Sequence, residues 1–108
     1  MEENNYQAKI LDFAGLIEYQ NGSVVSKIII AKPAGTVTLF AFDAGQALSE
    51  HTAPFDALIN IIDGAADIFI SGELFSLKKG QSIILPAKQP HSLKAEEKFK
   101  MTLVMIKT

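Results

Sequence analysis

Short apolar segments separated by turn residues run through almost the whole chain, and this pattern limits the fold more than any other feature. Residues 24–31 read VVSKIIIA, a run rich in β-branched side chains, and residues 99–107 alternate between apolar and polar side chains. Alternation of this kind is typical of strands, whose successive side chains point to opposite faces. No segment repeats apolar residues at the spacing of an amphipathic helix. The sequence therefore predicts an all-β fold that closes into a barrel or jelly roll.

About ten short strands are expected, bounded by glycine, proline, asparagine or aspartate. The first two ranges, 8–11 and 16–19, are either two strands or a strand and a turn; the others are 24–31, 35–43, 47–51, 57–62, 66–70, 74–77, 82–85, 91–94 and 99–107. Asn21-Gly22 is expected to turn the chain into the strand at 24–31, and Asp63-Gly64 to form a hairpin turn. In the last strand, the alternation assigns Phe99, Met101, Leu103 and Met105 to the interior.

The composition is that of one ordinary globular domain, expected over residues 1–108. The net charge is −2 and all ten basic residues are lysine, so neither a basic stripe nor an arginine fork is present for nucleic acid. The chain has no cysteine, and no apolar run approaches the roughly 18 residues that cross a bilayer. We therefore expect a cytoplasmic protein without a nucleic-acid or membrane partner.

The two histidines of the chain stand in two stretches built alike. The first stretch, residues 45–64, begins with Gly45, carries His51 and ends at Gly64. The second, residues 80–95, leads from Gly80 through an apolar strand and Pro86 to His91. Each histidine therefore lies next to a predicted strand.

These stretches resemble the paired motifs of the cupin superfamily, G(X)5HXH(X)3–4E(X)6G and G(X)5PXG(X)2H(X)3N. Gly45, His51 and Gly64 fit the first spacing, and Gly80, Pro86 and His91 fit the second. The chain departs from the motifs at four positions, where the family has a histidine, a glutamate, a glycine and an asparagine: Ala53, Ala57, Lys88 and Ala95. The resemblance implies a double-stranded β-helix, or jelly roll, whose metal motif is degenerate.

The resemblance carries two metal ligands over to this chain, His51 and His91, which are expected to face one cavity. Iron, nickel, manganese or zinc would suit imidazole ligands, although a mononuclear site normally has at least three protein ligands. Asp56 would complete a set of two histidines and one carboxylate if a bulge near Pro54 turned it inward; otherwise it caps a turn or pairs with a lysine. Because Ala53 and Ala57 remove half of the usual ligand set, we expect a site without a metal.

Two classes of function follow. The first is a binding module that holds a small organic ligand in the lumen beside His51 and His91, with Phe55 and Met101 in the lining. The alternative is a metal-dependent cupin enzyme, of the dioxygenase or isomerase type, that uses the two histidines as surviving ligands. The missing ligands favour the first class.

The strand at 24–31 carries bulky apolar side chains on both faces. A monomer that left such a strand bare would expose a large apolar patch to water. We therefore expect a homodimer, which the cupin resemblance also favours.

Overall fold

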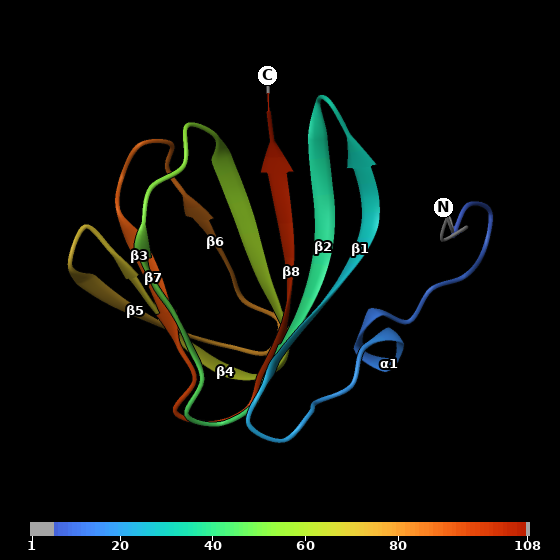
Figure 1. Ribbon diagram of the computed structural model, residues 1–108, viewed down its shortest axis with the longest axis horizontal. Coiled ribbons are helices and arrows are strands. Elements are labelled where there is room, and N and C mark those ends of the chain that lie inside the picture. Colours follow the sequence, from blue (N-terminus) through green and yellow to red (C-terminus); the bar gives the residue numbers. More distant parts are fainter. Residues whose placement is uncertain (1–5, 108) are drawn as a thin grey trace.

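Two antiparallel sheets that share one long strand make up residues 6–107, which this computed structural model describes (Figure 1). The predicted all-β fold is confirmed, as one domain; residues 1–5 and 108 of the predicted range lie outside the described part of the chain. Eight strands and one short helix form it: α1 Phe13–Leu16, β1 Val24–Lys32, β2 Gly35–Phe42, β3 Ala47–His51, β4 Asp56–Ile70, β5 Glu73–Lys78, β6 Ser82–Leu85, β7 His91–Lys94 and β8 Phe99–Ile106.

The shared strand is β4, which passes from one sheet into the other. Its first half pairs with β8 and β6, and its second half pairs with β7 and β5. The first sheet thus has the order β1-β2-β8-β4-β6, and the second sheet has the order β5-β4-β7-β3. Figure 1 shows the two sheets diverging from a narrow end toward a wide end.

Gly64 lies where β4 changes sheets, and the expected hairpin turn at Asp63-Gly64 is wrong. Gly64 has a φ of +74°, and the register against β8 shifts between Ile61 and Asp63. The positive φ is absorbed by a bulge that bends the strand without reversing it. A side chain at position 64 would overlap the carbonyl oxygen of Lys98, so only glycine fits this close approach.

The N-terminal segment also differs from expectation, because neither predicted strand forms in it. Residues 7–9 make a turn, and residues 13–16 form α1. Ile17 is buried, and it packs with Leu39 and Ala41 of β2 on the outer face of the first sheet. The segment thus covers part of an apolar face of the sheet, and it does so without forming a strand of its own.

Three polar contacts hold this segment in place. Lys100 donates from Nζ to the carbonyl oxygen of Ala14 at 2.6 Å, and Lys27 donates to that of Leu16 at 2.8 Å. A lysine at the last carbonyls of a helix supplies the hydrogen bonds that the helix itself lacks. The hydroxyl of Tyr19 donates to the Asp63 carboxylate at 2.5 Å. Burial and this contact hold the pKa of Tyr19 well above its ordinary value.

The main core fills the space between the inner faces of the two sheets. Phe42 and Phe99 stack there with ring centroids 4.5 Å apart, and Met101 is fully buried beside them. Leu103 and Met105 are both partly buried, and Leu103 packs against this cluster. No helix in residues 6–107 is long and apolar enough to span a membrane.

Candidate functional site at the wide end of the barrel

His51 and His91 meet at the ends of two paired strands. His51 is the last residue of β3, His91 is the first residue of β7, and the two are partners in the antiparallel register. Their Nε2 atoms lie 3.1 Å apart, with ring centroids 4.3 Å apart and the rings inclined at 69°. Residues that are 40 positions apart in the sequence thus form a single imidazole pair.

A bulge in β3 selects His51 for this position. Leu48 pairs with Leu93, but His51, and not Glu50, pairs with His91, so β3 carries one extra residue between the two pairs. Regular alternation from the half-buried Leu48 would place Glu50 on the inner face. Because of the extra residue, the imidazole of His51 takes the inward position that the carboxylate of Glu50 would otherwise have.

Each imidazole is also tethered through its other nitrogen. Nδ1 of His51 lies 2.8 Å from the carbonyl oxygen of Ser49, and Nδ1 of His91 lies 3.3 Å from that of Gln89. Because a carbonyl oxygen only accepts, these contacts favour a proton on each Nδ1. Both Nε2 lone pairs then face each other, an arrangement that a shared proton or a cation would stabilise.

In the neutral pair, the shorter contact decides where the two protons lie. His51 keeps its Nδ1 proton for Ser49 and accepts at Nε2, while His91 donates from Nε2 and leaves its longer Nδ1 contact to Gln89 unsatisfied. Burial lowers the pKa of His91 below its ordinary value of 6.5, and the positive charge of a protonated His51 lowers it further. When both rings are neutral, the pair therefore holds one donor and one acceptor.

The pair belongs to a row of four side chains that crosses the second sheet. His51 pairs with His91, His91 with Ile70, and Ile70 with Glu73 of β5. Cross-strand partners point to the same face, so all four side chains face inward at the wide end. Sequence reasoning missed Glu73, although the Ser71-Gly72 turn is the signal that places it opposite Ile70.

The emptied motif positions do not continue the wall that carries His51. Ala53 lies in the irregular connection between β3 and β4, whereas Ala57 is buried in β4. The carbonyl oxygen of Ala53 accepts a 2.7 Å hydrogen bond from the backbone N–H of Lys88. Lys88 replaces the second motif's glycine, yet it keeps a positive φ of 69°. This backbone bond joins the two segments that flank the histidines.

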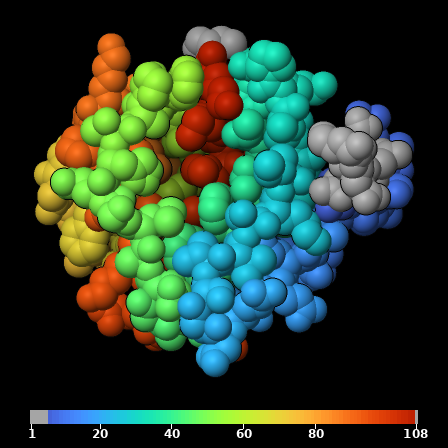
Figure 2. Space-filling model, in the orientation of Figure 1, coloured from blue at the N-terminus to red at the C-terminus, as the bar shows by residue number. Residues whose placement is uncertain are grey.

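Of the other candidate site residues, Asp56 has a backbone partner of its own and Met101 lies in the main core. The Asp56 carboxylate is exposed and accepts a 2.8 Å hydrogen bond from the N–H of Ala87, as a capping residue would. Among residues 6–107, no three His, Asp or Glu side chains are placed to hold one metal ion. Phe55 is half-buried in the connection after β3, and Met101 is sealed in the main core. The space-filling view shows residues 45–56, in green, on the face turned to the viewer (Figure 2).

Two sheets wrapped around one core, with polar residues gathered at the wide end, define a small single-domain barrel of the jelly-roll class. Residues 38–107 match the family model of the cupin domain, and the chain therefore belongs to the cupin family. No curated protein matches the chain.

Solved structures agree with this assignment. A conserved protein of unknown function from Streptococcus pyogenes is 34% identical, with a TM-score of 0.92, over 98% of this chain and 93% of that one. A cupin 2 conserved barrel domain protein from Leptotrichia buccalis is 44% identical over 86% of this chain, with a TM-score of 0.84, and this chain spans 45% of its length. A cupin superfamily protein from Desulfitobacterium hafniense is 27% identical, with a TM-score of 0.89, over 96% of this chain and 95% of that one.

Proposed function

We propose that this cupin binds a small organic ligand at the wide end of the barrel, beside His51 and His91. The observation that carries the proposal is the pairing of the two Nε2 atoms, 3.1 Å apart. Without a ligand, the Nε2 donor of one histidine and the Nε2 acceptor of the other bond only to each other. Both can instead form hydrogen bonds to a single ligand group that donates and accepts. A hydroxyl, an enol or a protonated carboxyl group has both capacities, so we propose a ligand that carries one of them.

A divalent metal ion is the second candidate, and the tethers of the histidines favour it. Metal-bound histidines usually donate from their other nitrogen to a carbonyl or carboxylate, as both Nδ1 atoms are placed to do. Two nitrogens at about 2.0–2.1 Å from one ion lie roughly 3 Å apart when the angle between them is near the tetrahedral or octahedral value. The spacing of 3.1 Å fits this requirement.

In that case His51 and His91 would hold iron, nickel, manganese or zinc, and the ion would supply a Lewis acid for a dioxygenase- or isomerase-type reaction. The chain's own contribution would be to keep both rings in the Nδ1–H tautomer. Since two histidines are fewer than the three protein ligands of an ordinary catalytic site, a metal-free ligand site is our first choice.

Nuclear magnetic resonance of the histidine side-chain nitrogens tests the proposal. Protein purified without an affinity tag is first analysed for metal content, and then titrated with small hydroxy and oxo carboxylic acids. Ligand binding at the pair should shift both Nε2 resonances, and His51→Ala should abolish the response while Glu50→Gln preserves it. A stoichiometric metal would favour the second candidate. Acids that leave both Nε2 resonances unchanged in a metal-free protein contradict the first.

We also propose a homodimer formed by the outer face of the first sheet. One row across this face is apolar on all five strands; its members are Ile30, Val37, Val104, Leu58 and Ile84. The N-terminal segment covers the neighbouring part of the face, over Leu39 and Ala41. Leu58 and Ile84 remain 40% and 62% exposed. A second copy presents the same uncharged row, so the two rows can bury each other.

Localisation in the cytoplasm also belongs to the proposal. A chain without cysteine is compatible with a reducing compartment.

A further inference from the structure

A groove opens between β5 and β6, the two strands that flank β4 from opposite sheets. Each of them pairs with β4 on one side only, so their other edges face each other across the gap between the sheets. The groove has a volume of about 350 Å³. This value falls within the range of small-molecule sites, roughly 300–1,000 Å³.

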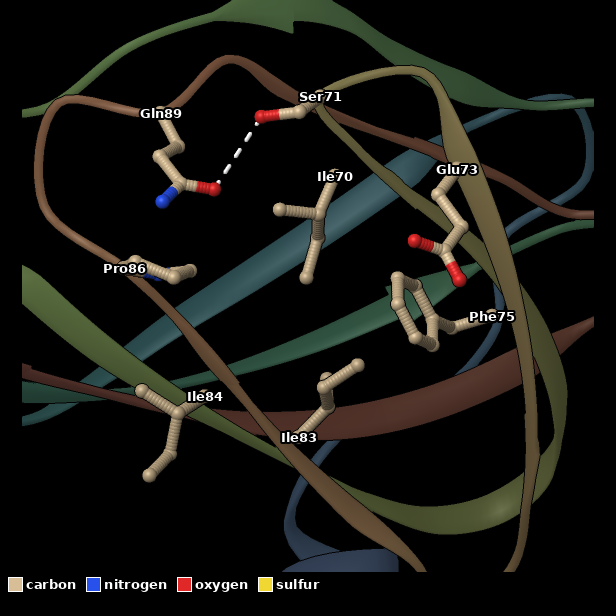
Figure 3. A pocket seen from close by; sticks show the side chains of 8 residues that line it. All are labelled: Ile70, Ser71, Glu73, Phe75, Ile83, Ile84, Pro86 and Gln89. Atoms are coloured by element: carbon tan, nitrogen blue, oxygen red, sulfur yellow. Dashed lines mark hydrogen bonds between the residues drawn. The ribbon is translucent and has the colours of Figure 1, made fainter.

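Apolar side chains from both sheets line most of the groove (Figure 3). Ile70 and Phe75 come from the second sheet, Ile83 and Ile84 come from the first, and Pro86 follows β6. Phe75 and Ile83 pack against the main core at their inner ends, which fixes the floor of the groove. An apolar ligand body would find a preformed surface there, because these side chains already have their positions.

The polar groups of the groove are few, and one of them is charged. Ser71 donates from Oγ to Oε1 of Gln89 at 3.2 Å, which leaves the Gln89 amide nitrogen without a protein partner in the described part of the chain. Of the described residues that line the groove, Glu73 is the one that is ionisable. Figure 3 shows its carboxylate beside the ring of Phe75. Among residues 6–107, this carboxylate has neither a hydrogen bond nor an ion pair.

We propose that the groove binds a small organic cation, an amine attached to an aromatic or branched apolar body. The ammonium group would pair with the Glu73 carboxylate, and the body would lie against Phe75 and Ile83, which pack on the main core. A carboxylate next to an apolar wall attracts a cation more strongly than one in open water, because the wall excludes solvent on one side. The same charge repels an anionic ligand of equal shape.

This site is separate from the one proposed at the histidines. Ile70 stands between Glu73 and His91 in the cross-strand row, so the groove and the imidazole pair lie on opposite sides of it. At about 4.8 Å between neighbouring strands, the backbones of Glu73 and His91 are roughly 10 Å apart. A ligand in the groove can therefore bind without contacting either imidazole.

Three probes that share a phenylethyl body and differ in charge test the proposal: phenethylamine, 2-phenylethanol and 3-phenylpropionate. Each is titrated into ¹⁵N-labelled protein at neutral pH, and amide shifts are followed. The amine should shift the amides of residues 70–75 and 83–89, and it should bind about two- to fivefold more tightly than the alcohol, the range of a solvent-exposed ion pair. The propionate should bind most weakly.

Variants then locate the site. Glu73→Gln should reduce amine affinity to that of the alcohol, whereas Glu97→Gln, which removes an exposed carboxylate elsewhere, should leave it unchanged. Phe75→Leu should weaken the amine and the alcohol alike, because it trims the apolar wall and keeps the charge. Equal affinity for the three probes, an unaltered amine affinity in Glu73→Gln, or no shift at millimolar amine would each overturn the proposal. These outcomes do not depend on the histidine site, whose test uses acids and side-chain nitrogen resonances.

Discussion

Replacing Gly64 with alanine should destabilise the protein far more than the same change at Gly72. Both glycines have positive φ, +74° and +84°, so an alanine at either position bears a left-handed backbone at a cost of about 1–2 kcal/mol. The surroundings differ, because a Cβ at Gly72 meets no atom within 4 Å, whereas a Cβ at Gly64 overlaps the backbone of Lys98 and Phe99. Forcing backbone apart adds about 1–3 kcal/mol, as overpacking does in cores.

The expected losses are therefore about 1–2 kcal/mol for Gly72→Ala and about 2–5 kcal/mol for Gly64→Ala. Urea unfolding followed by circular dichroism measures both, and roughly 4–8 °C of melting temperature corresponds to each kcal/mol in a domain of this size. Gly72→Ala serves as the matched control, because it tests the free-energy cost of the left-handed backbone without a steric overlap. Equal losses in the two variants would refute the close approach of β4 to the 98–99 backbone, and with it the bend that carries β4 into the second sheet.

Three more predictions concern the histidine pair, the outer face and the N-terminal segment. The pKa of His91 is lowered in the folded protein, so the unfolded chain takes up a proton first as pH falls. The urea concentration at the unfolding midpoint should therefore decrease as the pH falls below about 6.5, and His91→Gln should make this decrease smaller. Leu58→Lys should turn the proposed dimer into a monomer in light scattering, whereas Leu74→Lys, at a residue that is 51% exposed on the other sheet, should not; two dimeric variants would disprove the proposed interface. Lys100→Met should cost about 1 kcal/mol of unfolding free energy and speed proteolysis before residue 20, because it removes the 2.6 Å bond to Ala14.

Period and turn chemistry predict most strands of this fold from the sequence. The ranges expected at 82–85 and 91–94 coincide with β6 and β7, and the range at 24–31 ends one residue before β1 does. The N-terminal helix could not be predicted in the same way, because four residues are too few to show a helical period. Asp63-Gly64 has the composition of a hairpin turn, and only the partners of β4 reveal that the chain bends there without reversing.

The candidate site could be predicted in part. Motif spacing brought His51 and His91 into one hypothesis, and the structure places their Nε2 atoms 3.1 Å apart. The sequence could not predict why the two histidines meet. The bulge that places His51, in place of Glu50, opposite His91 is defined only by the pairing of β3 with β7. Glu73 could not be predicted as a site residue for a similar reason. The residues around it come from β6, which is distant in the sequence, and from β4, which precedes a turn.

The position of β4 in both sheets has a consequence for the order in which the chain can fold as it is synthesised. All four partners of β4 follow it in the sequence, and the strands before it reach the rest of the molecule only through late ones: β2 pairs with β8, and β3 pairs with β7. A nascent chain that lacks β7 and β8 therefore holds a β1–β2 hairpin and a β4–β5–β6 unit with no ladder between them. Contacts of such long sequence separation slow folding. The barrel can close only after its last strand has left the ribosome.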